Sequence, residues 1–358
     1  MRFVFKTDYF QDIALAHRPG QRLWYGLLAL ALAALPLWAG AYWISQVTLI
    51  LIYAVAGLGL MLLAGYTGLV SIGHAAFLGV GAYAQSYLVG KGWPFPLALL
   101  AAGGLSAAIG VIVGLPALRV KGIYLAIATL AFGFIAEEVF ARWESVTGGN
   151  GGLQVKAPAI GAWQLRSSES LYYLSLVLCV VVTLCVLNLL RGSTGRAFIA
   201  MRDSEVSAQS MGIHLARYKT LAFSLSAGIV GLAGALYAHK LRFVSPEQFG
   251  ISQSIDLLLL VVVGGLGSVH GAFLGAIFLI TMPQLISIAK DFLPSAIAQA
   301  TGLQALVFGA VLMGFVMFEP QGLYGRWVKV RTYFEMFPAY RKGLFRRQKS
   351  FQKSERLK

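Results

Sequence analysis

The chain has 358 residues, of which 58% are hydrophobic and only 12% are charged, and its mean hydropathy is +0.73. Because soluble domains usually carry about 25% charged residues, this composition excludes a soluble globular enzyme and a disordered chain. The formal net charge is +15, yet no nucleic-acid-binding motif accompanies it. The composition therefore predicts a protein that lies mostly in lipid and has no nucleic-acid partner.

Ten apolar runs follow one another along the chain, each close to the roughly 20 residues that a helix needs to cross the bilayer core. They lie near residues 23–44, 46–64, 68–89, 95–117, 122–140, 171–190, 217–238, 253–268, 270–288 and 303–319. The third is rich in glycine and polar residues and the eighth is short, so both are candidates for broken or re-entrant spans. We therefore expect an all-α, polytopic integral membrane protein. Residues 1–22 would form an N-terminal segment, 23–325 the transmembrane domain and 326–358 a basic tail.

The positive charges indicate which side of the membrane each loop faces. Ten spans place both termini on one side, and that side then holds 22 of the 29 Lys and Arg residues, whereas the Asp and Glu residues divide seven and seven. This bias in Lys and Arg alone is what the positive-inside rule describes. We therefore expect a multi-pass protein of the cell inner (plasma) membrane with both termini in the cytoplasm and a tail attracted to anionic lipid.

Ionisable side chains inside the expected spans are scarce. Glu137, Glu138 and Asp256 fall near outer ends, and His74 and His270 fall near inner ends, where they suit hydrogen-bonded packing. An ion-coupled carrier normally places a carboxylate near the midplane, so its absence disfavours that class. The sequence also lacks the P-loop, HExxH, CxxC and GxSxG motifs. We therefore expect no catalytic residues, no metal site and no cofactor bound by this chain.

Two pairs of short motifs recur at nearly the same offset. Residues 74–79 (HAAFLG) match 270–275 (HGAFLG), and residues 122–124 (GIY) match 322–324 (GLY). Matches in the same order predict a duplicated unit of about three spans, as in many transporter folds. Coincidence in a chain rich in Gly, Ala and Leu is the alternative.

The longest inner loop, residues 191–219, is too polar to span the membrane. Ser193 or Thr194 can cap a helix there, and an apolar pattern that includes Val206 and Met211 follows at helical spacing. Gly212 is placed to end this helix. The loop is therefore expected to form one short amphipathic helix, either packed on the bundle or docked in a groove of a soluble partner.

Five segments together carry a family resemblance. They are residues 195–205 (GRAFIAMRDSE) with 211–213 (MGI), 65–74 (GYTGLVSIGH), 118–130 (LRVKGIYLAIATL), 147–152 (TGGNGG) and 264–271 (GGLGSVHG). Over residues 45–325 the chain resembles permease subunits of branched-chain amino acid ABC importers, the LivM type. The resemblance implies a subunit that is not itself an enzyme. It implies as partners a LivH-type permease, two ATP-binding subunits that hold ATP and Mg²⁺, and a periplasmic substrate-binding protein.

The resemblance also implies roles for residues. The ATPase-coupling segment would comprise Arg196, Arg202, Asp203, Glu205, Ala208, Met211 and Gly212. One departure stands out, because ABC permeases commonly show Glu-Ala-Ala six residues before this Gly, where the present chain has Val206-Ser-Ala208. This departure puts individual ATPase contacts in question.

Further expectations concern the solute. Ser71, His74, Thr129 and His270 are expected along the translocation path, and Thr147, Gly149 and Asn150 are expected to face the binding protein. Alternatives are a permease for urea, short amides or other small polar solutes, an ion-coupled secondary carrier, and a membrane enzyme.

Overall fold

The computed structural model describes residues 19–117, 122–160, 163–164, 167–290, 303–318 and 321–336. Most of the expected N-terminal segment, the inner loop at 118–121 and the tail beyond 336 lie outside these described residues. The long helices are α2 (Pro19–Trp38), α3 (Ala41–Leu60), α4 (His74–Gly90), α5 (Phe95–Ala117), α6 (Ile123–Arg142), α8 (Ser168–Arg191), α11 (Leu215–Leu241), α12 (Ile251–Gly264), α13 (Val269–Lys290) and α15 (Leu303–Phe318). The remaining α-helices are α7 (Glu144–Thr147), α9 (Ser193–Asp203), α10 (Glu205–Ser210) and α16 (Gly322–Met336).

Each of the ten expected spans coincides with one of the long helices, but not all of these helices are long enough to span. Within the described residues, seven are long and apolar enough to cross a membrane: Ala41–Tyr66, Phe95–Leu115, Ile123–Arg142, Ser168–Arg191, Leu215–Leu241, Pro246–Gly264 and Val269–Lys290. The helices α2, α4 and α15 fall short, because their apolar helical stretches have 17 residues or fewer. The all-α, polytopic class is confirmed, and the count of ten spans stays a prediction.

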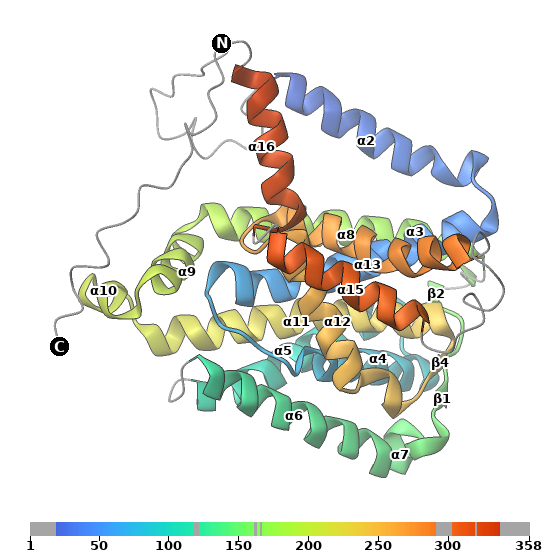
Figure 1. Cartoon of the computed structure of the whole chain (residues 1–358). Helices are drawn as coiled ribbons and strands as arrows, with labels where there is room; N and C mark the ends of the chain where they lie inside the picture. Colours follow the sequence, from blue (N-terminus) through green and yellow to red (C-terminus); the bar gives the residue numbers. More distant parts are fainter. Residues whose placement is uncertain are drawn as a thin grey trace.

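Most of the long helices run roughly along one direction, so the molecule has two distinct ends (Figure 1). The helices α9 and α10 lie at one end, and α7 with the short strands lies at the other (Figure 1). Two two-stranded antiparallel sheets occur there, in which β1 (Leu153–Gln154) pairs with β4 (Phe243–Val244) and β2 (Ala159–Ile160) pairs with β3 (Trp163–Gln164). The expected inner loop and the expected outer loop are therefore at opposite ends of the bundle.

Helix α11 is the centre of the bundle and packs against α3, α4 and α5. Small residues make this packing close: a Cβ at Gly81 of α4 would overlap the carbonyl of Gly231 on α11, and one at Gly234 of α11 would overlap the backbone of Leu78 on α4. Without a hydrophobic driving force in lipid, close approach of backbones is what holds helices together. Glycine at these positions therefore sets the distance between α4 and α11.

Two non-helical breaks interrupt the bundle near the end that carries α9. The first break, residues 67–73, follows the π-helix η1 (Met61–Tyr66), which continues α3, and it precedes α4. The second break, residues 265–268, joins α12 to α13. The backbone N–H of Gly267 donates to Sδ of Met61 at 3.1 Å, so the second break lies against η1, the helical segment that leads into the first break. The third expected span is thus broken before His74, and the eighth ends at Gly264. The expected internal repeat stays a prediction.

Candidate functional site

The polar loop 191–219 forms two helices rather than the single helix that its apolar pattern predicts. Ser204 separates α9 from α10, because its backbone is extended (φ −161°, ψ 114°) and its hydroxyl accepts a hydrogen bond from the N–H of Ser207 at 3.2 Å. A serine in this conformation is a strong N-cap, so a new helix starts at Glu205. The predicted caps Ser193 and Thr194 lie inside the first turn of α9, and Gly192 occupies the N-cap position with no side-chain hydrogen bond.

Gly212 ends α10 as the sequence predicts. Its φ is +85°, a value that favours glycine. Its N–H donates to Gln209 O at 3.0 Å, and the N–H of Ile213 donates to Ala208 O at 3.0 Å. This pair of bonds is the Schellman arrangement, which satisfies the last carbonyls of a helix. The chain therefore turns sharply at Gly212 before α11 begins.

Both short helices are anchored to the bundle by their inner faces. Phe198, Met201 and Ala208 are buried together with Phe223 of α11 in one small core. A buried ion pair adds to this anchor, because Nζ of Lys219 lies 2.7 Å from Oε1 of Glu205, and the Lys219 side chain is only 4% exposed. Ala208 and Glu205 thus face this chain's own core, and their contact with an ATP-binding subunit stays a prediction.

The outer face of α10 is exposed although it carries large apolar side chains. Val206 is 76% exposed and Met211 is 84% exposed. We call the exposed residues of this turn the docking face: Val206, Ser207, Gln209, Ser210, Met211 and Gly212. The sequence predicts Val206 and Met211 in one amphipathic helix that either packs on the bundle or docks on a partner, and the structure leaves both side chains exposed. Ser207, Gln209 and Ser210 are not among the predicted coupling residues, although Ser204, a favoured N-cap residue, signals the helix start before them.

The predicted coupling residues Arg196, Arg202 and Asp203 are exposed on α9. Arg202 and Asp203 form an ion pair, with Nη2 of Arg202 3.2 Å from Oδ1 of Asp203. Nη1 of Arg202 also donates to the carbonyl oxygen of Gly65 at 3.2 Å. Arg202, which is predicted to contact a partner, therefore also contacts the interior of the bundle.

Three of the four predicted path residues lie together in the interior. His74 starts α4 and is fully buried, with Nδ1 2.7 Å from Oγ of Ser71 and Nε2 2.8 Å from Oγ of Ser226. Ser226 donates to Gly59 O at 2.7 Å, so its oxygen accepts from Nε2–H of His74, and Nδ1 accepts from the Ser71 hydroxyl. All these groups are hydrogen-bonded, as buried polar groups generally are.

Thr129 of α6 joins this cluster through the first break. Its hydroxyl accepts from the N–H of Ile72 at 3.1 Å and donates to Ala126 O at 2.9 Å. His270 lies elsewhere, exposed at the start of α13, with Nε2 2.8 Å from the hydroxyl of Tyr25. Ser71, His74 and Thr129 therefore fasten the first break to α6 and α11, while His270 is not part of this cluster.

The expected binding-protein side lies at the opposite end. Thr147 is buried and serves the fold, because its hydroxyl accepts from the N–H of Gly149 at 3.2 Å and lies 2.7 Å from the carbonyl oxygens of Phe140 and Trp143. Gly149 is also buried, whereas Asn150 is exposed. Of the three predicted residues, only Asn150 is exposed, and its contact with a binding protein stays a prediction.

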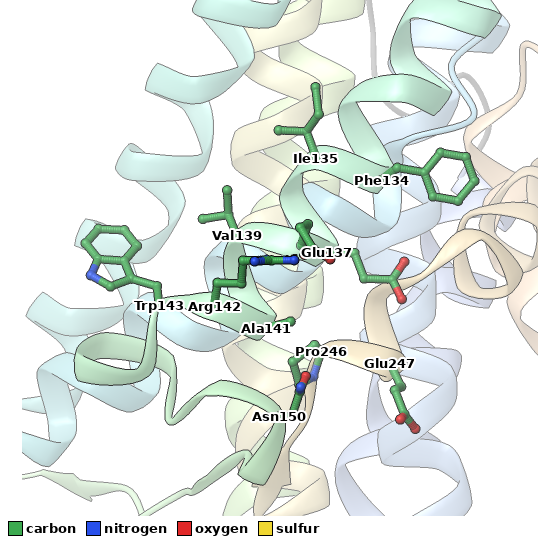
Figure 2. A pocket seen from close by; sticks show the side chains of 11 residues that line it. Phe134, Ile135, Glu137, Val139, Ala141, Arg142, Trp143, Asn150, Pro246 and Glu247 are labelled. Carbon is green, nitrogen blue, oxygen red and sulfur yellow. Dashed lines mark hydrogen bonds and ion pairs between the residues drawn. The ribbon is translucent and has the colours of Figure 1, made fainter.

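Asn150 lines an open pocket of about 1010 Å³ between α6 and the 3₁₀ helix η3 (Pro246–Phe249) (Figure 2). Glu137, Glu138 and Glu247 contribute carboxylates to its lining, and Arg142 pairs with Glu138. Among the described residues, no group of three or more His, Cys, Asp or Glu side chains is arranged to hold a metal ion. The lining of this pocket therefore carries three carboxylates and one arginine.

Comparison with known proteins confirms the resemblance. Residues 42–316 match the family described as the permease component of the branched-chain amino acid transport system. The chain is 34% identical over 328 residues to the high-affinity branched-chain amino acid transport system permease protein LivM of Escherichia coli K12, covering 85% of this chain and 75% of LivM. The values for LivM of Salmonella typhimurium are the same.

A more distant relative carries a different name. The autoinducer 2 import system permease protein LsrC of Escherichia coli O157:H7 is 25% identical over 277 residues, covering 74% of this chain and 79% of LsrC. No solved structure matches the chain. The family match and the identity to LivM together show that this chain belongs to the family of permease components of branched-chain amino acid transport systems.

Proposed function

We propose that the chain is the transmembrane permease subunit of an ABC importer that moves branched-chain amino acids across the cell inner membrane. A LivH-type sister permease completes the membrane part, and two ATP-binding subunits supply the energy. A periplasmic binding protein delivers the solute to the end that carries Asn150. The present chain holds neither ATP nor Mg²⁺.

The docking face is the observation that supports this proposal most strongly. It exposes Val206 and Met211 on a short helix whose opposite side is anchored by Ala208 and the Lys219–Glu205 ion pair. Two large apolar side chains on a rigid, water-facing turn suit insertion into a groove of a soluble protein. In this proposal, closure of the ATP-binding subunits moves α9 and α10, and these helices move the spans.

The proposed topology has ten spans with both termini in the cytoplasm. It adds α2, α4 and α15 to the seven helices that are long enough to span. Their apolar stretches correspond to about 25 Å of helix, at a rise of about 1.5 Å per residue, close to the bilayer core of about 30 Å. For α4, the first break completes the crossing inside the protein, where irregular backbone is tolerated. Both breaks then lie near the cytoplasmic side.

Transport in reconstituted vesicles tests the energy source. The chain, its sister permease and both ATP-binding subunits are placed in proteoliposomes with the binding protein outside. We expect leucine uptake that requires ATP and persists when an uncoupler removes the proton gradient. Uptake that survives without ATP but collapses with the uncoupler would instead support an ion-coupled carrier.

The identity of the solute is a separate part of the proposal. Identity of 34% to LivM against 25% to LsrC supports branched-chain amino acids over the solute of LsrC. Urea and short amides are the alternative small polar solutes. Equilibrium binding of the partner binding protein to leucine, isoleucine, valine and urea decides between them. We expect the branched-chain amino acids to bind, and binding of urea alone would contradict the assignment.

A further inference from the structure

Arg202 occupies a position from which one side chain reaches both breaks. It lies in the last turn of α9, whose residues Phe198 and Met201 are held in the core. Its side chain is 39% exposed, so part of it points into the bundle rather than into water. The anchor of α9 therefore fixes the point from which the guanidinium group extends.

Three glycines lie beside this side chain. Gly65 belongs to η1, Gly68 to the first break and Gly267 to the second break. A Cβ on Gly68 would lie 3.1 Å from Cγ of Arg202, and one on Gly267 would lie 3.2 Å from its Nη1. The φ angles of Gly68 (+73°) and Gly267 (+81°) also favour glycine. The backbone of both breaks is thus shaped around the Arg202 side chain.

The charge of Arg202 suits this position. The helix formed by α3 and η1 ends at Tyr66, and α12 ends at Gly264, so the guanidinium lies near the C-terminal ends of two spans. The last carbonyls of a helix lack partners within the helix, and its C-terminus carries partial negative charge. Nη1 donates to one of these carbonyls, that of Gly65. A guanidinium can hold such a carbonyl and a carboxylate at the same time because its donors form a rigid fork.

The other donors of the Arg202 guanidinium, Nε and Nη2, point toward the docking face. Nε and Nη2 of Arg202 donate to Oδ1 of Asp203 at 3.3 Å and 3.2 Å. Asp203 is two-thirds exposed and immediately precedes the N-cap of α10. A partner on the docking face therefore lies next to Asp203.

We propose that Arg202 is the positioning residue that links the docking face to the two breaks, so that movement of α9 changes the packing of the first break against the second. This inference rests on the proposed function. A shift of α9 moves the guanidinium away from Gly65, and the two breaks, which both lie beside the Arg202 side chain at Gly68 and Gly267, then lose their common partner. In proteins, a small shift of one element is usually amplified into a larger movement when packed elements switch between discrete arrangements.

The test compares Arg202→Gln with Arg217→Gln in the reconstituted importer. Arg217 is also an exposed arginine at this end of the bundle, on α11, and it serves as the matched control. For Arg202→Gln we expect the ATP-binding subunits to remain bound and hydrolysis to continue. We expect the ratio of solute taken up to ATP hydrolysed to fall about tenfold, the effect of losing one hydrogen bond from a charged group. Arg202→Lys, which keeps the charge but not the fork, should recover only part of the ratio.

A second readout follows the first break directly. Val70 lies in this break and is exposed, so a cysteine at position 70, in a chain with both native cysteines replaced by alanine, reports its accessibility. We expect ATP to change the rate at which this cysteine is labelled in the chain that keeps Arg202, called the parent, and not in the same chain with Arg202→Gln.

The outcomes distinguish a failure of this inference from a failure of the proposed function. If the parent importer shows no ATP-driven uptake, the proposed function fails. If the parent is active and Arg202→Gln keeps the parent ratio and the parent labelling change, the inference is overturned. Release of the ATP-binding subunits by Arg202→Gln, with Arg217→Gln intact, would also overturn it, because Arg202 would then act in docking.

Discussion

The buried ion pair between Lys219 and Glu205 should decide whether α10 stays attached to the bundle. Nζ of Lys219 and Oε1 of Glu205 are 2.7 Å apart, and the two side chains are 4% and 22% exposed. Removing one member of a buried pair costs about 3–5 kcal/mol, because the other charge stays buried without its partner. Since one-fifth of Glu205 is in contact with water, we expect Glu205→Gln to fall at the lower end, about 3 kcal/mol.

The loss of this stabilising free energy should appear as more frequent opening of α10 rather than as unfolding of the whole bundle. A change of about 3 kcal/mol raises the population of the open form more than a hundredfold, at about 1.4 kcal/mol for each factor of ten. Hydrogen exchange reports this opening at two amides, because the N–H of Met211 bonds to Ser207 O and that of Ile213 bonds to Ala208 O. We expect both amides to exchange faster in Glu205→Gln by about this factor.

Two controls make the measurement specific. Asp203→Asn removes a carboxylate from an exposed pair with Arg202, and such pairs contribute about 0–1 kcal/mol. The double variant with Glu205→Gln and Lys219→Met removes both charges and should recover much of the protection. Equal exchange in Glu205→Gln and Asp203→Asn would refute the view that the ion pair anchors α10.

Two further substitutions test the packing of the bundle. Gly81→Ala should lower thermal stability by about 1–3 kcal/mol, the usual cost of overpacking, because its Cβ would overlap the carbonyl of Gly231. Gly104→Ala, also inside a long helix but with nothing within 4 Å of its Cβ, should leave the melting temperature unchanged or slightly higher, because alanine favours a helix more than glycine does. Equal effects of the two substitutions would contradict the close packing of α4 and α11. Ser226→Ala should cost about 1–3 kcal/mol, since a buried group that loses its partner keeps its desolvation penalty, here Nε2 of His74. An unchanged thermal transition in this variant would count against the hydrogen-bond cluster around the first break.

The fold could be predicted largely from apolar length, because lipid requires a continuous apolar helix for each crossing. Every expected span coincides with a helix. The boundaries were less predictable: residues 41–44, assigned to the first run, instead begin α3. The exact position of the first break could not be predicted either, because its residues Leu69, Val70 and Ile72 are as apolar as those of a helix. Their backbone is set by partners on other helices, such as the hydroxyl of Thr129, 57 residues away.

The site could be predicted only in part, because the spacing of residues within one helix does not reveal contacts with residues that are far away in the sequence. The loop, its position and the turn at Gly212 followed from local signals. The interior contact of Arg202 did not, since it joins residues 137 positions apart. The family resemblance places Glu205 in the segment that contacts the ATP-binding subunits, and it does not reveal the ion pair with Lys219 on α11.

Site-specific photo-crosslinking from the docking face tests most directly whether ATP-binding subunits drive this permease. A photoreactive amino acid is placed at Met211, and in a second variant at Asn150, which is exposed at the opposite end of the bundle. After illumination of the assembled importer, we predict a covalent adduct with the ATP-binding subunit from position 211 and none from position 150. An adduct with that subunit from position 150 but not from position 211 would contradict both the docking face and the proposed orientation.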